Sequence, residues 1–260
     1  MDYRLAGRTA LITGASKGIG FAIAQAMAAQ ECNLWLISRD GESLSKAAAK
    51  ISTGSKVKVT TLATDVGAPG AAEHIFKACP GADIVVNNAG SIPSGTIFQV
   101  DEAAWRASWD SKVFGYINMS RCYMAAMKER WEGVIVNILG IAGELRDAAY
   151  LAGSVGNAAL IAFTKAMGAW SPQFGVRVVG VSPGPVSTER LIKMQKYKAL
   201  QKTGSEEGWE KALTTFPFGR AATPEEVADA VVFLASPLSA YTSGAVLNLD
   251  GGITGGRPIL

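Results

Sequence analysis

The sequence is poor in the residues that bind metals and form disulfides, and this excludes two classes of protein. It has one histidine and three cysteines, Cys32, Cys79 and Cys122, which lie far apart. No set of these residues has the spacing of a metal site. An odd number of scattered cysteines also argues against a disulfide framework and favours a reducing compartment. We therefore expect neither a metal site nor a structural disulfide.

The sequence also lacks long apolar runs and blocks of charge of one sign. No apolar stretch approaches the roughly 18 residues that a membrane span needs, and the N-terminal segment MDYRLAGRTALITG lacks the order of a signal peptide. The 25 Lys and Arg residues and 22 Asp and Glu residues give a net charge of +3, without a basic cluster. We expect a soluble, cytoplasmic protein that contacts neither a membrane nor nucleic acid.

Apolar residues and glycine, by contrast, are abundant. The chain of 260 residues is 48% hydrophobic and contains 29 glycines, which suits one domain over residues 1–260 with a large core. Short runs rich in Val, Ile and Leu alternate with helical patterns. The strand candidates are residues 9–13, 33–38, 56–62, 84–87, 133–138, 177–182 and 246–249. The main helix candidates are residues 18–30, 102–130, 150–170 and 224–235. This alternation predicts an α/β fold, a Rossmann-type doubly wound parallel sheet of about seven strands with helices on both faces.

One region, residues 184–223, departs from this rhythm. It is polar, helical in parts, and follows directly on a strand end, where ligands of such sheets bind. That position suits a mobile lid over a substrate, although an ordinary surface insertion has the same pattern.

A glycine-rich turn joins the first predicted strand to the first helix. The segment TGASKGIG places Gly14 at a tight turn, Gly18 where the backbone can approach a pyrophosphate, and Gly20 where the helix packs closely on the sheet. The free N–H groups and the positive dipole end of the helix then face the phosphates. A turn that binds nothing would share the glycines, but the strand–turn–helix context favours a dinucleotide site.

Further motifs follow the later strands, and with the glycine turn they resemble the short-chain dehydrogenase/reductase family over nearly the whole chain. They are Asp65–Val66, NNAG (87–90), SPGPVST (182–188), FGRAATPEEVADAVVFLAS (218–236) and SGAVLNLDGG (243–252). The resemblance implies that Asp65 holds the adenine amino group, that Val66 lies beside the ring and that Asn87 braces the sheet. It also implies that Ala89 and Gly90 flank the adenosine ribose, and that Pro183, Gly184, Val186 and Thr188 contact the nicotinamide end. The implied cofactor-binding residues are Gly14, Ser16, Lys17, Gly18, Ile19, Gly20, Arg39, Asp65, Val66, Asn88, Ala89, Gly90, Pro183, Gly184, Val186 and Thr188.

The charge at the end of the second strand favours NADP(H) over NAD(H). A site selective for NAD usually places a carboxylate there to bind the ribose 2′-hydroxyl. Here the strand ends at Arg39, and Lys17 lies in the glycine turn. Two cations near one ribose suit a 2′-phosphate, which a guanidinium binds with two parallel hydrogen bonds. The alternative, since Asp40 follows immediately, is that both cations are simply solvated.

The resemblance also implies an altered catalytic set. Family members that reduce ketones or oxidise alcohols use Asn, Ser, Tyr and Lys, with the tyrosine transferring the proton. Counting from Asn137 on the fifth strand places the serine at Gly140, the tyrosine at Gly153 and the lysine at Asn157, and the supporting asparagine falls on Lys112. All four family positions are therefore changed.

Two of these changes are reciprocal. Lys112 stands where the family has asparagine, and Asn157 stands where the family has lysine. We hypothesise that the ammonium group stays near the nicotinamide ribose but comes from the opposite helix. The alternative is that Lys112 is a surface or interface lysine.

Three other side chains are candidates for the proton transfer. Tyr150 lies on the same helix face as Gly153, Ser154 and Asn157 and starts one turn, roughly 5 Å, from the expected place. Glu144 and Asp147, in the preceding loop, are alternative acids, although loop carboxylates are usually solvated. The glycine at 153, which costs a helix roughly 1 kcal/mol, provides either room for a bulky ligand or close helix packing in an oligomer.

These observations predict an oxidoreductase acting on a small carbonyl or alcohol substrate with a rearranged proton path. The candidate catalytic residues are Lys112, Tyr150, Glu144 and Asn157. Two alternatives stay open: a catalytically silent sensor or scaffold that binds NADP(H), and a non-redox enzyme that uses the same pocket. In the family the two long helices pair between subunits, so the resemblance implies a homodimer or homotetramer.

Overall fold

Seven parallel strands form a single sheet in the order β3-β2-β1-β4-β5-β6-β7. The computed structural model describes residues 2–256, except for the side chains of Lys198, Gln201 and Lys202. The strands are β1 (Thr9–Thr13), β2 (Asn33–Ser38), β3 (Val59–Ala63), β4 (Ile84–Asn87), β5 (Gly133–Ile138), β6 (Val176–Pro183) and β7 (Val246–Leu249). The strand order reverses between β1 and β4, and ligands of such sheets bind at the carboxyl ends of the strands on either side of that reversal.

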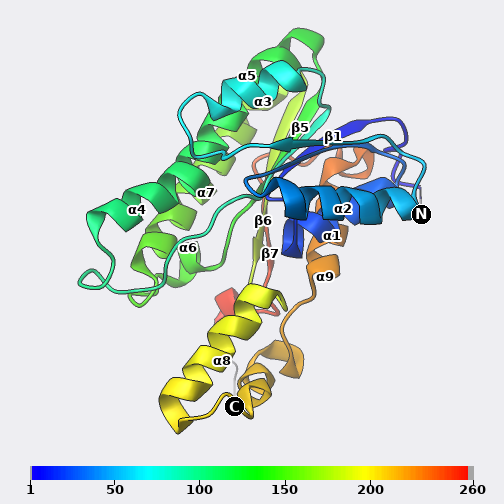
Figure 1. Cartoon of the computed structure of the whole chain (residues 1–260). Helices are drawn as coiled ribbons and strands as arrows, with labels where there is room; N and C mark the ends of the chain where they lie inside the picture. The colour runs from blue at the N-terminus through cyan, green and yellow to red at the C-terminus, as the bar shows by residue number, and fades with distance from the viewer. Residues whose placement is uncertain (1, 257–260) are drawn as a thin grey trace.

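Helices cover both faces of this sheet, which confirms the predicted Rossmann-type architecture. In Figure 1, α1, α2 and α9 lie on one side of the strands, and α3, α5 and α7 lie on the other. The α-helices are α1 (Gly18–Ala29), α2 (Gly41–Gly54), α3 (Ala71–Ala78), α4 (Glu102–Trp109), α5 (Gly115–Arg130), α6 (Ala142–Leu145), α7 (Leu151–Trp170), α8 (Glu189–Thr203) and α9 (Pro224–Ala235).

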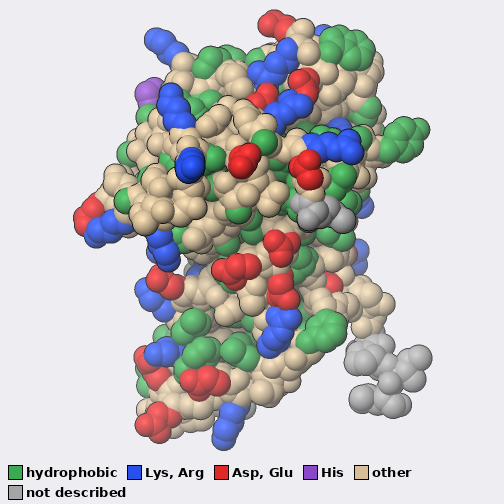
Figure 2. Space-filling view, turned by 90° about the vertical axis from the view of Figure 1, so that its right-hand side faces the viewer, with side chains coloured by type: hydrophobic (Ala, Val, Ile, Leu, Met, Phe, Trp, Pro, Cys, Tyr) green, Lys and Arg blue, Asp and Glu red, His purple; other side chains and the backbone are tan. Residues whose placement is uncertain are grey.

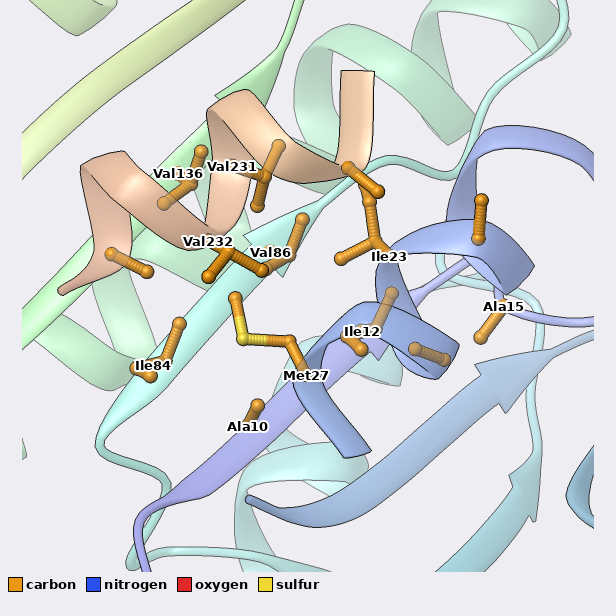
Figure 3. Close-up of a cluster of buried hydrophobic side chains, with 14 of the residues drawn as sticks. Ala10, Ile12, Ala15, Ile23, Met27, Ile84, Val86, Val136, Val231 and Val232 are labelled. Atoms are coloured by element: carbon orange, nitrogen blue, oxygen red, sulfur yellow. The ribbon is translucent and has the colours of Figure 1, made fainter. Parts of the chain in front are cut away.

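The central strands are apolar on both faces because each face packs against helices. Figure 3 shows one of the two layers, in which Ile23 and Met27 of α1 and Val231 and Val232 of α9 contact alternate residues of the sheet. These sheet residues are Ala10, Ile12, Ile84, Val86 and Val136. Burying a side chain of this size stabilises the fold by about 1.5–3 kcal/mol. The core therefore fixes the strand ends where the site is built.

Several predicted elements differ by one residue at an end, and two differ more. The third strand was expected at residues 56–62, but it runs from Val59 to Ala63, and the N–H of the preceding Lys58 donates to the Asn33 side chain rather than to a backbone carbonyl. The helix expected at residues 102–130 is divided into α4 and α5 by a π-helical turn, η1 (Asp110–Phe114). A π turn inserts one residue into the helical ladder and is often found at functional sites.

The segment predicted as a lid forms a lobe beyond the carboxyl ends of the strands. It contains α8 and the short 3-10 helices that follow, drawn in yellow and gold at the bottom of Figure 1. The hydroxyl of Thr188 accepts a hydrogen bond from the Leu191 N–H and so begins α8. A capping box between Thr223 and Glu226 begins α9. The structure thus gives the lobe a defined start and end, and its movement stays a prediction.

Charged side chains of both signs are mixed over the face shown in Figure 2. Among the described residues, no helix is long and apolar enough to cross a membrane. Within residues 2–256, no group of three or more histidine, cysteine or acidic side chains is arranged to hold a metal ion.

Candidate cofactor and catalytic site

The glycine turn closes tightly against the end of β4. Gly14 and Gly18 have φ angles of +67° and +57°, which favour glycine. A Cβ atom at Gly14 would lie 2.9 Å from the Cα of Ala89, and one at Gly20 would overlap the carbonyl oxygen of Gly14. Close packing therefore requires glycine at positions 14 and 20, and the positive φ angle favours it at 14 and 18.

The first turn of α1 leaves its N–H groups without a side-chain partner. Lys17 is the N-cap residue, and its side chain makes no capping hydrogen bond within the described part of the chain. Uncapped N–H groups at a helix start, together with the helix dipole, form a binding site for phosphate. The cradle therefore fits the pyrophosphate of a dinucleotide.

Hydrogen bonds from the NNAG segment fasten it to the glycine turn. The backbone N–H groups of Asn88 and Ala89 donate to the Thr13 hydroxyl at 2.9 and 3.0 Å. The Asn88 side chain donates in turn to the carbonyl oxygens of Thr13 and Gly14, at 2.9 and 3.2 Å. The two loops on either side of the strand-order reversal thus behave as one unit.

The expected nicotinamide end of the site reaches the same turn. The Gly184 N–H donates to the Leu249 carbonyl at 2.9 Å, and Val186 is buried. The Thr188 Cγ2 atom lies 3.5 Å from the position of a Cβ at Gly18. The segment that begins at Pro183 therefore reaches back to the glycine turn, and the three predicted cofactor segments converge.

The two cations expected at the ribose phosphate pair with carboxylates of different segments. The hydroxyls of Ser16 and Ser38 are 3.1 Å apart, so the backbones that lead into Lys17 and Arg39 lie near one another. Arg39 lies 3.8 Å from the Asp65 carboxylate, and Lys17 lies 3.9 Å from the Glu189 carboxylate. Such exposed ion pairs contribute little free energy, so a phosphate can replace either carboxylate as a partner.

Lys112 extends from the π turn η1 across the backbone of Gly90. A Cβ at Gly90 would lie 2.7 Å from the Lys112 Cβ, so the lysine stem occupies that space. The ammonium donates to the Ile138 carbonyl at the end of β5, at 3.1 Å. Burial, together with the nearby positive charge of Arg190, lowers the pKa of Lys112 to about 8. Both protonation states of the lysine are then accessible near neutral pH.

Asn157 reaches the same strand end from α7. Its side chain is 3% exposed and donates to the Gly153 carbonyl at 2.8 Å. Its Oδ1 atom is buried and has no hydrogen-bond partner among the described residues, and it lies 3.4 Å from the position of a Cβ at Gly140. The structure thus brings both members of the predicted reciprocal pair to the carboxyl end of β5.

Tyr150 stands immediately before α7 rather than inside it. Its backbone pairs with Gly95, and its half-buried ring folds back over Gly153. The ring carbons Cε1 and Cζ overlap the place where a Cβ at residue 153 would lie. The ring therefore spans much of the one-turn offset expected from the sequence.

The alternative acids are engaged elsewhere. Glu144 is exposed and accepts a hydrogen bond from the Asn248 side chain at 3.0 Å. Asp147 is exposed, and its carboxylate accepts from the Ala149 N–H at 2.8 Å. Ser154 donates to the Asp147 backbone carbonyl. The geometry therefore favours Tyr150 and Lys112 as the groups nearest the predicted chemistry.

Two residues of this region were missed in the sequence. Arg190, in the first turn of α8, donates to the Ile92 carbonyl at 2.7 Å and lies close enough to Lys112 to affect its pKa. Tyr116 donates to the same Ile138 carbonyl as Lys112, at 2.9 Å. Its spacing of four residues from Lys112 was an available signal, whereas Arg190 was marked only by its place just after SPGPVST.

The chain is similar in sequence and fold to known dehydrogenases and reductases. The family model described as Enoyl-(Acyl carrier protein) reductase matches residues 14–254. Galactitol 2-dehydrogenase (L-tagatose-forming) from Cereibacter sphaeroides is 35% identical, over 98% of this chain and 99% of the relative. The 3-oxoacyl-[acyl-carrier-protein] reductase FabG from Vibrio cholerae is 31% identical, over 96% and 98%. The crystal structure of L-sorbose reductase from Gluconobacter frateurii, complexed with NADPH and L-sorbose, superposes with a TM-score of 0.91 at 30% identity and covers 99% of this chain and 100% of that one.

Proposed function

The chain belongs to the short-chain dehydrogenase/reductase family, and from this premise we propose that it is an NADP(H)-dependent oxidoreductase with a rearranged proton-transfer site. Its reaction interconverts a carbonyl and an alcohol on a small molecule. The observation that carries the proposal is the ring of Tyr150, which overlaps the start of a side chain at residue 153. The Tyr150 hydroxyl, one bond beyond Cζ, thereby lies close to where the family's tyrosine side chain would begin, although position 153 itself is a glycine.

The residues around the glycine turn fit the cofactor. The uncapped start of α1 and the close-packed glycines hold the pyrophosphate, while Arg39 and Lys17 hold the 2′-phosphate. The residues from Pro183 to Thr188 hold the nicotinamide end. When bound, the cofactor supplies or accepts the hydride. The NADPH in the structure of L-sorbose reductase supports the preference for NADP(H) over NAD(H).

The protein's own groups provide the proton and the charge. The Tyr150 hydroxyl gives a proton to the substrate oxygen during reduction and takes it back during oxidation. The Lys112 ammonium stabilises the negative charge that develops on the substrate oxygen and on the Tyr150 hydroxyl oxygen during the transfer. Asn157, whose Oδ1 is buried and unpaired among the described residues, accepts a hydrogen bond from the substrate, the cofactor ribose or a bound water. Lys112 would thus supply the positive charge of the family's lysine, and Asn157 would supply a hydrogen-bonding group at that lysine's position.

A sensor or scaffold that binds NADP(H) would not need a structured nicotinamide end. The segment that begins at Pro183 is fastened to Leu249 and reaches the glycine turn through Thr188. A protein that bound only the adenosine half would not require this arrangement. We therefore rank turnover above silent binding, and the experiment below separates the two.

The test combines binding with turnover. NADPH and NADH are titrated by fluorescence, and NADPH oxidation is then followed with L-sorbose, 3-oxoacyl thioesters and other carbonyl compounds. We expect tighter binding of NADPH, and a loss of rate of about 100-fold or more in Tyr150→Phe. Tyr241→Phe, on a fully exposed tyrosine, is the matched control. NADPH binding without any turnover would favour the alternative that the protein is a sensor. An unchanged rate in Tyr150→Phe would exclude Tyr150 as the proton donor.

We also propose a homodimer or homotetramer that pairs through α5 and α7. The side chains of Phe114, Val155 and Trp170 on and beside these helices are 40–50% exposed, at 49%, 44% and 48%. Covering such apolar groups on association is favourable. Light scattering coupled to size-exclusion chromatography tests this, and a monomer at micromolar concentration would contradict it.

A further inference from the structure

Two cations from different elements reach the short segment that follows β4. The Lys112 stem, from the π turn, crosses Gly90. The Arg190 guanidinium, from the first turn of α8, donates to the Ile92 carbonyl at 2.7 Å. Gly90 and Ile92 are only two residues apart, and Arg190 comes two residues after Thr188, so both cations border the candidate cofactor site.

Neither cation has a carboxylate partner. Within residues 2–256, no ion pair includes Lys112 or Arg190, although eight pairs form elsewhere. Lys112 uses one of its three donors on the Ile138 carbonyl, and Arg190 uses one of its five on the Ile92 carbonyl. Donors on both groups therefore stay available.

The two positive charges also oppose one another. Burial, and after it the positive charge of Arg190, lower the pKa of Lys112, and Lys112 and Arg190 contact backbone positions only two residues apart. An anion between like charges removes this repulsion and strengthens its own binding in a partly desolvated site. The arrangement is therefore complementary to a negative group that the protein itself does not supply.

We propose that Lys112 and Arg190 form an anion-binding subsite and that the natural substrate is a carbonyl or alcohol compound bearing a carboxylate. The guanidinium fork matches a carboxylate or a phosphate. The cofactor pyrophosphate is the other possible source of the anion, but the uncapped start of α1 already provides a place for it. This inference rests on the proposed function, since it names the substrate class of the same site.

Binding can be tested without turnover. The full-length protein, saturated with NADP+, is titrated calorimetrically with oxamate, a small unreactive carboxylate, and with oxamide, its neutral isostere. We expect oxamate to bind and oxamide to bind at least tenfold more weakly. Arg190→Gln should weaken oxamate binding by about 10- to 100-fold, Arg190→Lys should restore part of it, and NADPH affinity should be unchanged in both.

The control removes a charge from the same helix. Lys193→Gln lies on the exposed side of α8 and should leave oxamate affinity unchanged. Equal binding of oxamate and oxamide, or equal effects of the two glutamine variants, would overturn the proposal. A parallel loss of NADPH affinity in Arg190→Gln would assign the subsite to the cofactor phosphates instead. Failure of the wild-type protein to bind NADPH would reject the proposed function separately, because that titration contains no oxamate.

Discussion

The ring of Tyr150 lies over Gly153, so that its carbons Cε1 and Cζ overlap the place where a side chain at residue 153 would begin. The two positions cannot both carry a side chain in this arrangement. A glycine inside a long helix, which is otherwise unfavourable by about 1 kcal/mol relative to alanine, is thereby explained by the ring that it accommodates.

Gly153→Ala should therefore inactivate the enzyme without unfolding it. The added methyl group displaces the Tyr150 ring, and we expect a loss of rate of about 100-fold, close to that of Tyr150→Phe. NADPH affinity should stay within about twofold, and thermal stability should change little, because the gain in helix propensity offsets the strain. Gly54→Ala, at an open position at the end of α2, is the control. A fully active Gly153→Ala would contradict the role of the ring.

Gly20→Ala should disrupt the cofactor cradle. A Cβ there would overlap the Gly14 carbonyl and lie 2.5 Å from the Asn88 side chain, so the turn must open. Overpacking of this kind costs about 1–3 kcal/mol, or a fall in Tm of roughly 2–4 °C per kcal/mol for a protein of this size. NADPH binding should be lost or weakened more than tenfold. Gly81→Ala, where a methyl group meets nothing within 4 Å, should change neither quantity.

Arg39→Ala should reduce discrimination between the two cofactors. We expect the Kd for NADPH to rise by about 10- to 100-fold, because a charge-assisted bond to the 2′-phosphate is lost, and the Kd for NADH to change less than threefold. Arg106→Ala removes an exposed arginine that is paired with Glu102 on α4 and serves as the control. A parallel rise in both Kd values would show that Arg39 contributes no selectivity.

Lys112 should make stability depend on pH above about pH 8. Its pKa falls to about 8 in the folded protein from the ordinary 10.5, so the unfolded chain binds more protons between these values. The free energy of unfolding should therefore rise with pH from about 8 to about 10.5, and the penalty for burying the charge should be fully present below pH 8. Urea denaturation of the wild type and Lys112→Met at pH 7, 8, 9 and 10 measures this difference. Identical pH dependence in the two proteins would contradict it.

The pH dependence of the reaction rate provides a second measurement of the pKa of Lys112. An apparent pKa near 8 in the wild type should disappear in Lys112→Met. In Arg190→Gln it should move upward, because the opposing positive charge is removed. Tyr116, the other group on the Ile138 carbonyl, has a strongly raised pKa owing to burial and so stays protonated throughout.

The glycine turn and the strands could be predicted because local sterics determine them. Gly14 and Gly18 have positive φ angles that other residues rarely adopt, and the apolar runs mark strands buried on both faces. The π turn η1 could not be predicted, because one extra residue hardly alters the apolar pattern of a long helix.

The side chains around Lys112 were less predictable for a different reason. Arg190 binds a backbone carbonyl 98 residues away, at Ile92, and a carbonyl leaves no signal in the sequence. The position of the Tyr150 ring depends on pairing of its backbone with Gly95, a contact that only the folded chain creates. Such tertiary contacts override what the helix pattern alone suggests.

Three residues of the candidate site contact the backbone that follows β4, each at a different position along it. The lysine crosses it at Gly90, the arginine binds it at Ile92, and the tyrosine pairs with it at Gly95. A point substitution at one of these three residues leaves the backbone at the other two positions in place. A deletion or insertion of a single residue in this stretch shifts the backbone by about 3.3–3.6 Å and so misaligns the others together. Length, rather than side-chain identity, is the property of this loop on which the whole site depends.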